Sequence, residues 1–114
     1  MTTRSLINAL LALAILPVSS IANAQTPAER GMKIYADQKC ALCHAIAGKG
    51  NAKGPLDNVG GKLPAAAIRR WIVTPAEMTK AAKAERKPAM KAYASLPGAD
   101  LDALVAYLVT LKAK

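Results

Sequence analysis

Cys40-Ala41-Leu42-Cys43-His44 is the stretch that decides the fold of this chain. Two thiols at this spacing can add to the two vinyl groups of a haem, and the adjacent imidazole can then reach the iron from one face. The stretch contains both cysteines and the single histidine of the 114 residues. It therefore predicts one covalently attached haem, held by Cys40 and Cys43, with His44 as an axial ligand of the iron.

Two other uses of the same thiols have to be weighed. A Cys40–Cys43 dithiol could act in thiol–disulfide exchange, but that chemistry is typical of C-x-x-C near a βαβ pattern, and the sequence has no such pattern. A zinc site would need four ligands, and two cysteines with one histidine leave the fourth unnamed. Both alternatives are disfavoured.

The first 24 residues have the features of a secretory signal peptide. Arg4 precedes an apolar stretch from Leu6 to Val18, and Ala22-Asn23-Ala24 provides small residues for cleavage. The alternative is an uncleaved membrane anchor, but the apolar stretch is shorter than the roughly 20 residues that a spanning helix needs. We expect residues 1–24 to be removed and residues 25–114 to form one periplasmic domain without stable membrane insertion.

A domain of this size buries little apolar surface and often needs a metal or another staple. The chain has no phenylalanine, three tyrosines and one tryptophan, so aromatic side chains cannot fill its centre. A covalently bound haem would supply the missing apolar body.

The charge is strongly basic, with 16 Lys and Arg against 7 Asp and Glu and a net charge of +9. A basic surface favours acidic partners. Nucleic acid is disfavoured because the chain is predicted to be exported and the lysines lack interleaved aromatic residues. Lys80, Lys83 and Lys87, with Arg86, form a basic stripe at helical spacing. This stripe is either a solvated helix face or a docking surface for redox partners with acidic surfaces.

The hydrophobic pattern and the capping residues predict helices throughout and an all-α fold. The first helix begins with the capping box Thr26-Pro27-Ala28-Glu29, and the last has apolar residues at helical spacing. The expected segments are a helix from Thr26 to about Lys39, a loop over 48–61, a helix from Pro64 to before Pro75, a helix over 75–86, an extended segment over 87–98, and a final helix containing Leu101, Leu104, Val105, Leu108 and Leu111.

A thioether as the second axial ligand would give the low-spin iron that rapid electron transfer requires. Met90 is the predicted ligand, because it lies in a proline-flanked coil from which a side chain can reach the far face of a haem. Met78 is a weaker candidate, expected in the core or on the surface. Met32, on the first helix, is expected in the core.

On these residues the chain resembles a class I c-type cytochrome over Thr26–Lys112. The matching pieces are the first helix with Gly31 and Tyr35, the Cys40–His44 motif, Gly54-Pro55-Leu56, Trp71-Ile-Val-Thr-Pro75, Lys87-Pro-Ala-Met90 and the final helix with Tyr107. The resemblance implies a cytochrome c fold, with about four short helices wrapped around one haem c, and the function of an electron-transfer protein rather than an enzyme.

The resemblance also assigns roles to single residues. It implies that the Pro55 carbonyl accepts a hydrogen bond from the ring of His44, and that Gly31 lets the first and last helices cross closely near Tyr107. Trp71 would bound the haem or bind a propionate, although a plain core role is equally compatible with the sequence.

The chain departs from the family directly after Met90. Lys91 stands where the family usually has proline, and this leaves the ligand-bearing segment freer. We therefore expect Lys87 or Lys91 to displace Met90 at mildly alkaline pH, and a five-coordinate iron is a further possibility.

The residues favour a monomeric periplasmic carrier of single electrons between redox proteins. The seven acids are dispersed, and no pattern typical of a substrate site appears. The alternative is a haem-bearing subunit of a periplasmic dehydrogenase or sulfur-oxidising complex. Purification as a stable monomer would favour the free carrier.

Overall fold

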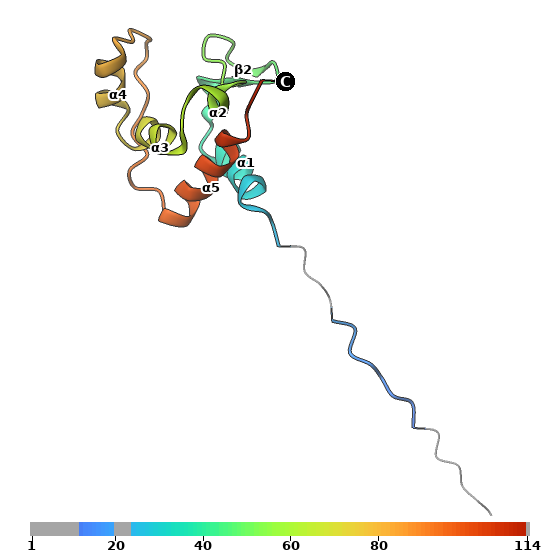
Figure 1. Cartoon of the computed structure of the whole chain (residues 1–114). Coiled ribbons are helices and arrows are strands. Elements are labelled where there is room, and N and C mark those ends of the chain that lie inside the picture. The colour runs from blue at the N-terminus through green and yellow to red at the C-terminus, as the bar shows by residue number, and fades with distance from the viewer. Residues whose placement is uncertain (1–11, 20–23, 114) are drawn as a thin grey trace, which may run out of the picture.

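The computed structural model describes residues 12–19 and 24–113 (Figure 1). Residues 12–19 are exposed and belong to no helix or strand. Arg4, Ala22 and Asn23, on which the predicted signal peptide and its cleavage site depend, lie outside the described residues. No helix within the described ranges is long and apolar enough to cross a bilayer.

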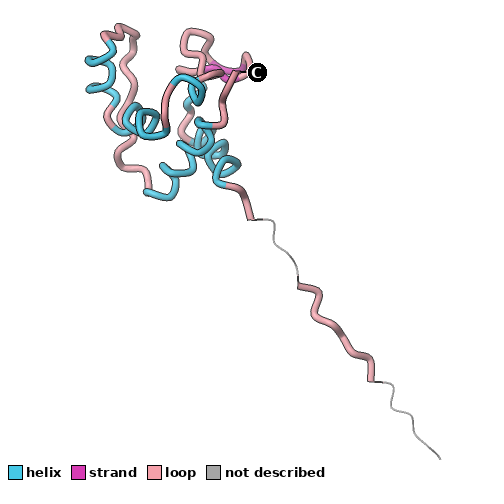
Figure 2. The backbone as a smooth tube through the Cα atoms, in the orientation of Figure 1, coloured by secondary structure: helices cyan, strands magenta, loops and turns pink. Residues whose placement is uncertain are grey.

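Helices dominate the structure, as the sequence predicts (Figure 2). The elements are α1 (Pro27–Asp37), a 3-10 turn (Cys40–Leu42), β1 (Ala45–Ile46), β2 (Lys49–Gly50), α2 (Val59–Lys62), α3 (Ala65–Val73), α4 (Pro75–Ala82) and α5 (Gly98–Val109). The two strands pair antiparallel, with Ala45 opposite Gly50 and Ile46 opposite Lys49. This small sheet and the short helix α2 were not predicted.

The first helix begins with the predicted capping box. The Glu29 amide donates to the Thr26 hydroxyl at 3.2 Å, and the Thr26 amide donates to the Glu29 carboxylate at 2.8 Å. These reciprocal bonds satisfy two amides that a helix start leaves without partners. The helix ends at Asp37, two residues earlier than expected, and Lys39 then adopts a left-handed conformation with φ of 57°. This turn directs the chain into the motif that follows.

The most extensive contact between helices joins α1 and α5. A Cβ on Gly31 would lie 2.6 Å from the Tyr107 Cβ and would collide with the carbonyl of Ala103, so only glycine allows this approach. The rings of Tyr35 and Tyr107 meet edge to face at 6.0 Å between centroids, and Arg30 pairs with Asp100. The predicted role of Gly31 is confirmed.

The core forms where α5 faces α1 and α3. Its buried side chains are Ile34, Ile68, Ile72, Leu101, Ala103, Leu104, Val105 and Leu108. Four of the five apolar positions predicted for the last helix are among them. Leu111 lies beyond the helix end, and its carbonyl accepts the Gly60 amide at 2.9 Å, which joins α2 to the C-terminal segment.

Two expectations about exposed positions are wrong. Met32 is not in the core, since 53% of its surface is exposed; Gly31 and Ile34 occupy the buried face of α1 instead. The basic stripe does not follow one helix face, because α4 ends at Ala82 and Lys83 is left-handed with φ of 51°. Lys87 lies outside any helix.

Candidate haem site

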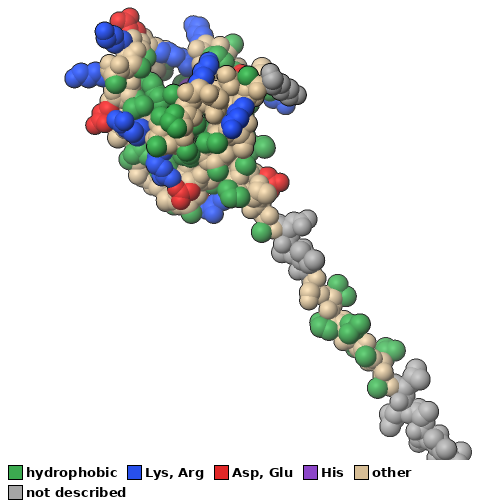
Figure 3. All heavy atoms as spheres, viewed as in Figure 1, with side chains coloured by type: hydrophobic (Ala, Val, Ile, Leu, Met, Phe, Trp, Pro, Cys, Tyr) green, Lys and Arg blue, Asp and Glu red, His purple; other side chains and the backbone are tan. Residues whose placement is uncertain are grey.

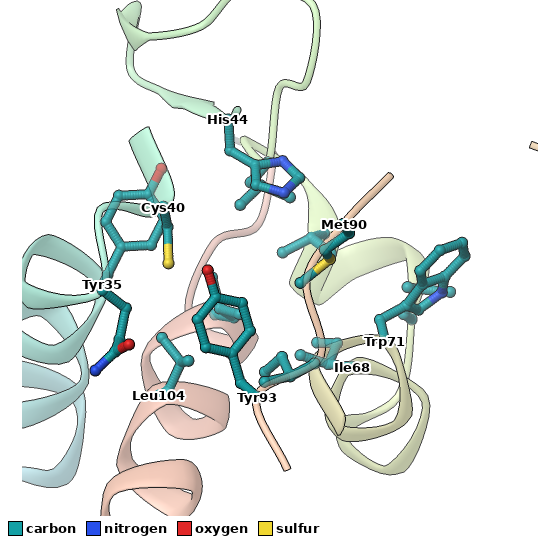
Figure 4. A pocket seen from close by; sticks show the side chains of 14 residues that line it. Tyr35, Cys40, His44, Ile68, Trp71, Met90, Tyr93 and Leu104 are labelled. Atoms are coloured by element: carbon teal, nitrogen blue, oxygen red, sulfur yellow. The ribbon is translucent and has the colours of Figure 1, made fainter. Parts of the chain in front are cut away.

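An apolar pocket opens between the helical core and the chain segments around residues 40–44 and 90–93 (Figure 4). It brings together the predicted residues Cys40, His44, Trp71 and Met90 from three separate parts of the sequence. The complete lining is Tyr35, Gln38, Cys40, His44, Leu56, Val59, Leu63, Ile68, Trp71, Ile72, Met90, Tyr93, Leu104 and Leu108.

The motif itself forms a tight turn at one wall of this pocket. The amides of Cys43 and His44 both donate to the Cys40 carbonyl, at 3.1 and 2.9 Å. The Cys40 side chain lines the pocket, and Cys43 is half-buried beside it without being part of the lining. Both thiols are free.

The His44 ring is oriented by a backbone carbonyl. Its Nδ1 lies 3.0 Å from the Gly54 oxygen. A carbonyl can only accept, so Nδ1 carries the proton and the lone pair on Nε2 is left for a metal. Burial lowers the pKa of His44, the charge of Arg86 lowers it further, and the bond to Gly54 raises it. The neutral imidazole that iron ligation requires is therefore favoured.

The carbonyl that orients His44 is not the predicted one. The resemblance implied the Pro55 carbonyl, but the Gly54 carbonyl accepts the hydrogen bond from His44. A parallel bridge pairs Pro55 with Ala45, and this register turns the carbonyl one residue earlier towards the ring. The Ala45 amide donates to the Gly54 oxygen at 3.0 Å, and the Leu56 amide donates to the Ala45 oxygen at 2.8 Å. Pro55 is exposed and does not line the pocket.

The surroundings of the thiols do not favour the two alternative chemistries. Burial raises the pKa of Cys40, and the neighbouring Cys43 adds to this, whereas a redox-active thiol needs a lowered pKa. In the part of the chain that the structure describes, no three His, Cys, Asp or Glu side chains gather as a metal cluster would require. The surroundings of Cys40 therefore do not favour disulfide exchange.

Met90 alone among Met32, Met78 and Met90 lines the pocket. It lies in coil, is half-buried and projects towards the same cavity as His44 (Figure 4). Met78 is half-buried on α4, away from the pocket lining. The arrangement offers an imidazole and a thioether from two different segments.

Three aromatic side chains shape the rest of the cavity. Trp71 lies at its margin, whereas Tyr93 projects into its middle (Figure 4). Burial raises the pKa of Tyr93, and the nearby thiols of Cys40 and Cys43 raise it further. Sequence reasoning gave Tyr93 no role, although an aromatic residue three positions after Met90 was a usable signal.

Tyr35 has the one buried side-chain polar atom without a hydrogen-bond partner in the described residues, its hydroxyl. Burial raises the pKa of Tyr35 to about 12, with a contribution from Cys40. An unpartnered hydroxyl beside an apolar pocket is costly unless a bound group covers it.

The residues present fit a covalently bound haem. The walls are mostly apolar, as the faces of a porphyrin require, and the other lining residues include Cys40 and His44, which can bind a haem. Cys40 and Cys43 would form the thioether bonds, and His44 presents a free Nε2 for the iron. The orphaned Tyr35 hydroxyl indicates a cavity that is built to be filled.

Comparison with known proteins agrees with this reading. The family model described as Cytochrome c matches residues 28–112. The chain is also 30% identical over 97 residues to "Cytochrome c oxidase subunit 2" of Alkalihalophilus pseudofirmus strain OF4, an alignment that covers 77% of this chain and 27% of that protein. No solved structure matches.

The family match covers every helix of the described domain and the whole pocket lining. It explains why both cysteines and the histidine stand in one five-residue motif, and why the cavity beside them is apolar. The chain belongs to the cytochrome c family and carries covalently bound haem c, which makes it a haem-based electron-transfer protein.

Proposed function

We propose that this protein is a monomeric periplasmic carrier of single electrons whose haem iron is ligated by His44 and Met90. The bound haem supplies the Fe(II)/Fe(III) couple. The observation that carries the proposal is the convergence of a neutral His44 ring and the Met90 thioether on one apolar pocket. The protein's own part is to hold both ligands in place and to keep water away from them.

The ligand assignment is tested by the ferric optical spectrum of the matured protein with Met90→Ala beside it. Methionine ligation gives a weak far-red charge-transfer band, and this band should vanish in the variant. Met78→Ala is the matched control and should keep the band. A wild-type spectrum that is high-spin, or that Met90→Ala leaves unchanged, refutes the assignment.

Export and monomeric state are tested on the same preparation. Cleavage after Ala24 should leave a periplasmic protein whose N-terminal residue is Gln25, and sedimentation should give the mass of one chain with one haem. Retention of residues 1–24 in the membrane fraction would instead identify an anchored form.

A basic surface near Met90 is the proposed docking site for an acidic redox partner. Lys80, Lys83, Arg86 and Lys87 are all exposed, and none of them takes part in the ion pairs found among the described residues. A shallow groove between α4 and residues 84–90 shares Met90 with the haem pocket, and its charged lining residues are Lys80, Lys83 and Glu85. On the face seen in Figure 3, Lys and Arg side chains surround apolar side chains.

Charge reversal tests this docking surface. Lys80→Glu with Lys83→Glu should slow oxidation by the anionic probe ferricyanide and flatten its dependence on salt. Lys49→Glu with Lys53→Glu makes the same change in net charge at β2 and the loop that follows it, and is the control. Equal slowing by the two double variants would show that only net charge matters.

A second function, that of a haem-bearing subunit of a larger periplasmic oxidoreductase, is supported by the similarity to an oxidase subunit. A dehydrogenase or a sulfur-oxidising complex is the expected setting. Native purification under low salt distinguishes the two: a stable complex of fixed composition favours the subunit, and a free monomer favours the carrier.

A further inference from the structure

Arg86 lies against Gly54, although the two residues are 32 positions apart in the sequence. A Cβ on Gly54 would collide with the guanidinium group and with the Cys43 carbonyl. The guanidinium of Arg86 can therefore lie on the backbone only because residue 54 has no side chain. Arg86 comes from the segment after α4, and Gly54 from the loop after the Cys40–His44 motif.

This contact joins the two segments that carry the iron ligands. Gly54 is the residue whose carbonyl orients the His44 ring, at 3.0 Å from Nδ1. Arg86 precedes Met90 by four residues along the same exposed segment.

The Met90-bearing segment has little else to hold it. Within the described part of the chain, no hydrogen bond involves residues 85–92. Before this segment, the nearest backbone hydrogen bond runs from the Ala84 amide to the Thr79 carbonyl at 3.0 Å. After it, the nearest runs from the Tyr93 amide to the Ile72 carbonyl at 2.9 Å. Between these two points the segment depends on side-chain contacts for its position.

We propose that Arg86 is a positioning residue that holds the Met90-bearing segment against the His44-bearing loop. The proposal rests on the function proposed above only where it concerns iron ligation; the closure of the segment is a property of the chain itself. Arginine suits this place because its planar guanidinium can lie flat on a glycine backbone and stays charged at any physiological pH. A lysine ammonium is compact and strongly hydrated, and would cover Gly54 less well.

The first test measures opening of the segment without reference to the iron. Lysyl endopeptidase cleaves after Lys91 when residues 85–92 leave the body of the protein, and the cleavage rate follows the population of the open form. In the matured protein, Arg86→Gln should raise this rate about fivefold, the change expected from loss of one half-exposed contact. Lys62→Gln removes the same charge from an exposed position on α2 and should leave the rate within about twofold of wild type. Arg86→Lys would add a cleavage site at position 86, so its effect is measured by imidazole binding alone, where it should fall between wild type and Arg86→Gln.

The second test measures ligand replacement. Imidazole binds the ferric iron only when the protein's own ligand leaves, so Arg86→Gln should bind imidazole about fivefold more tightly than wild type and Lys62→Gln. Circular dichroism confirms that all variants fold.

An unchanged rate of cleavage after Lys91 in Arg86→Gln would overturn the positioning role. An equal rise in Lys62→Gln would overturn it too, because the effect would then come from net charge. Should Met90→Ala leave the wild-type spectrum unchanged, the ligation proposal fails by itself, and cleavage after Lys91 still decides the role of Arg86.

Discussion

Replacing Gly31 with alanine tests the packing that brings the two ends of the domain together. The added Cβ would lie 2.6 Å from the Tyr107 Cβ and 2.7 Å from the Ala103 carbonyl carbon, and would collide with the Ala103 oxygen. Ordinary contacts between such atoms begin near 3.4 Å. Two of the three obstacles are backbone atoms of α5, so the helices must separate.

The expected cost follows from two opposing effects. Overpacking of this kind costs about 1–3 kcal/mol, occasionally more, and the rigid backbone neighbours place Gly31→Ala at or above the upper end. Alanine in a helix interior gains about 1 kcal/mol over glycine. The net loss is therefore about 2–3 kcal/mol, which for a domain of this size lowers the melting temperature by roughly 10–20 °C.

Chemical denaturation of the matured protein, followed by circular dichroism, measures this loss. Gly98→Ala is the matched control, because nothing lies within 4 Å of its Cβ and its φ is not positive. That variant should be stabilised by about 0.4–1 kcal/mol through its less flexible unfolded chain. A Gly31→Ala protein at least as stable as wild type would refute the close crossing of α1 and α5.

Three further changes have defined outcomes. Cys40→Ala leaves one thiol for attachment, so the alkaline pyridine spectrum should shift to that of a haem retaining one vinyl group; an unshifted spectrum would contradict the role of Cys40. The pKa of Tyr35 is raised from 10.0 to about 12 in the folded protein, so stability should fall between these pH values as unfolding releases a proton, and Tyr35→Phe should lose less in pH-dependent denaturation. Lys87→Ala with Lys91→Ala should retain methionine ligation to higher pH than wild type; a wild-type far-red band that persists well above pH ~10 would exclude lysine displacement.

Local signals predicted the start of the first helix and the buried face of the last. The capping box at Thr26 and Glu29 is complete within four residues, and the spacing of Leu101, Leu104 and Leu108 follows the helical period. These features depend on neighbours in sequence, so no knowledge of the fold was needed. That Cys40, His44 and Met90 would meet at one haem pocket was predicted from haem chemistry and from the family resemblance.

The rest depends on contacts between distant residues. Helix α2 contains Gly60 and Gly61, which disfavour helix, yet it forms where the Gly60 amide donates to the carbonyl of Leu111. Helix α4 ends where Lys83 adopts a left-handed conformation, which the presence of a lysine at this position does not predict. Likewise, pairing with Ala45 decides that the carbonyl of Gly54, and not that of Pro55, accepts the hydrogen bond from His44.

The contact between α1 and α5 closes a long loop of the chain, because Arg30 and Asp100 form an ion pair although they are 70 positions apart in the sequence. The entropic cost of closing a loop rises only slowly with the length of the loop. The interface between the first helix and the last offsets this cost. A single cut between residues 85 and 92 would therefore leave two fragments, one with α1 and the haem-attachment motif and the other with α5, still clasped by the same helix pair. The domain is built so that two separate peptides could reassemble into one cytochrome.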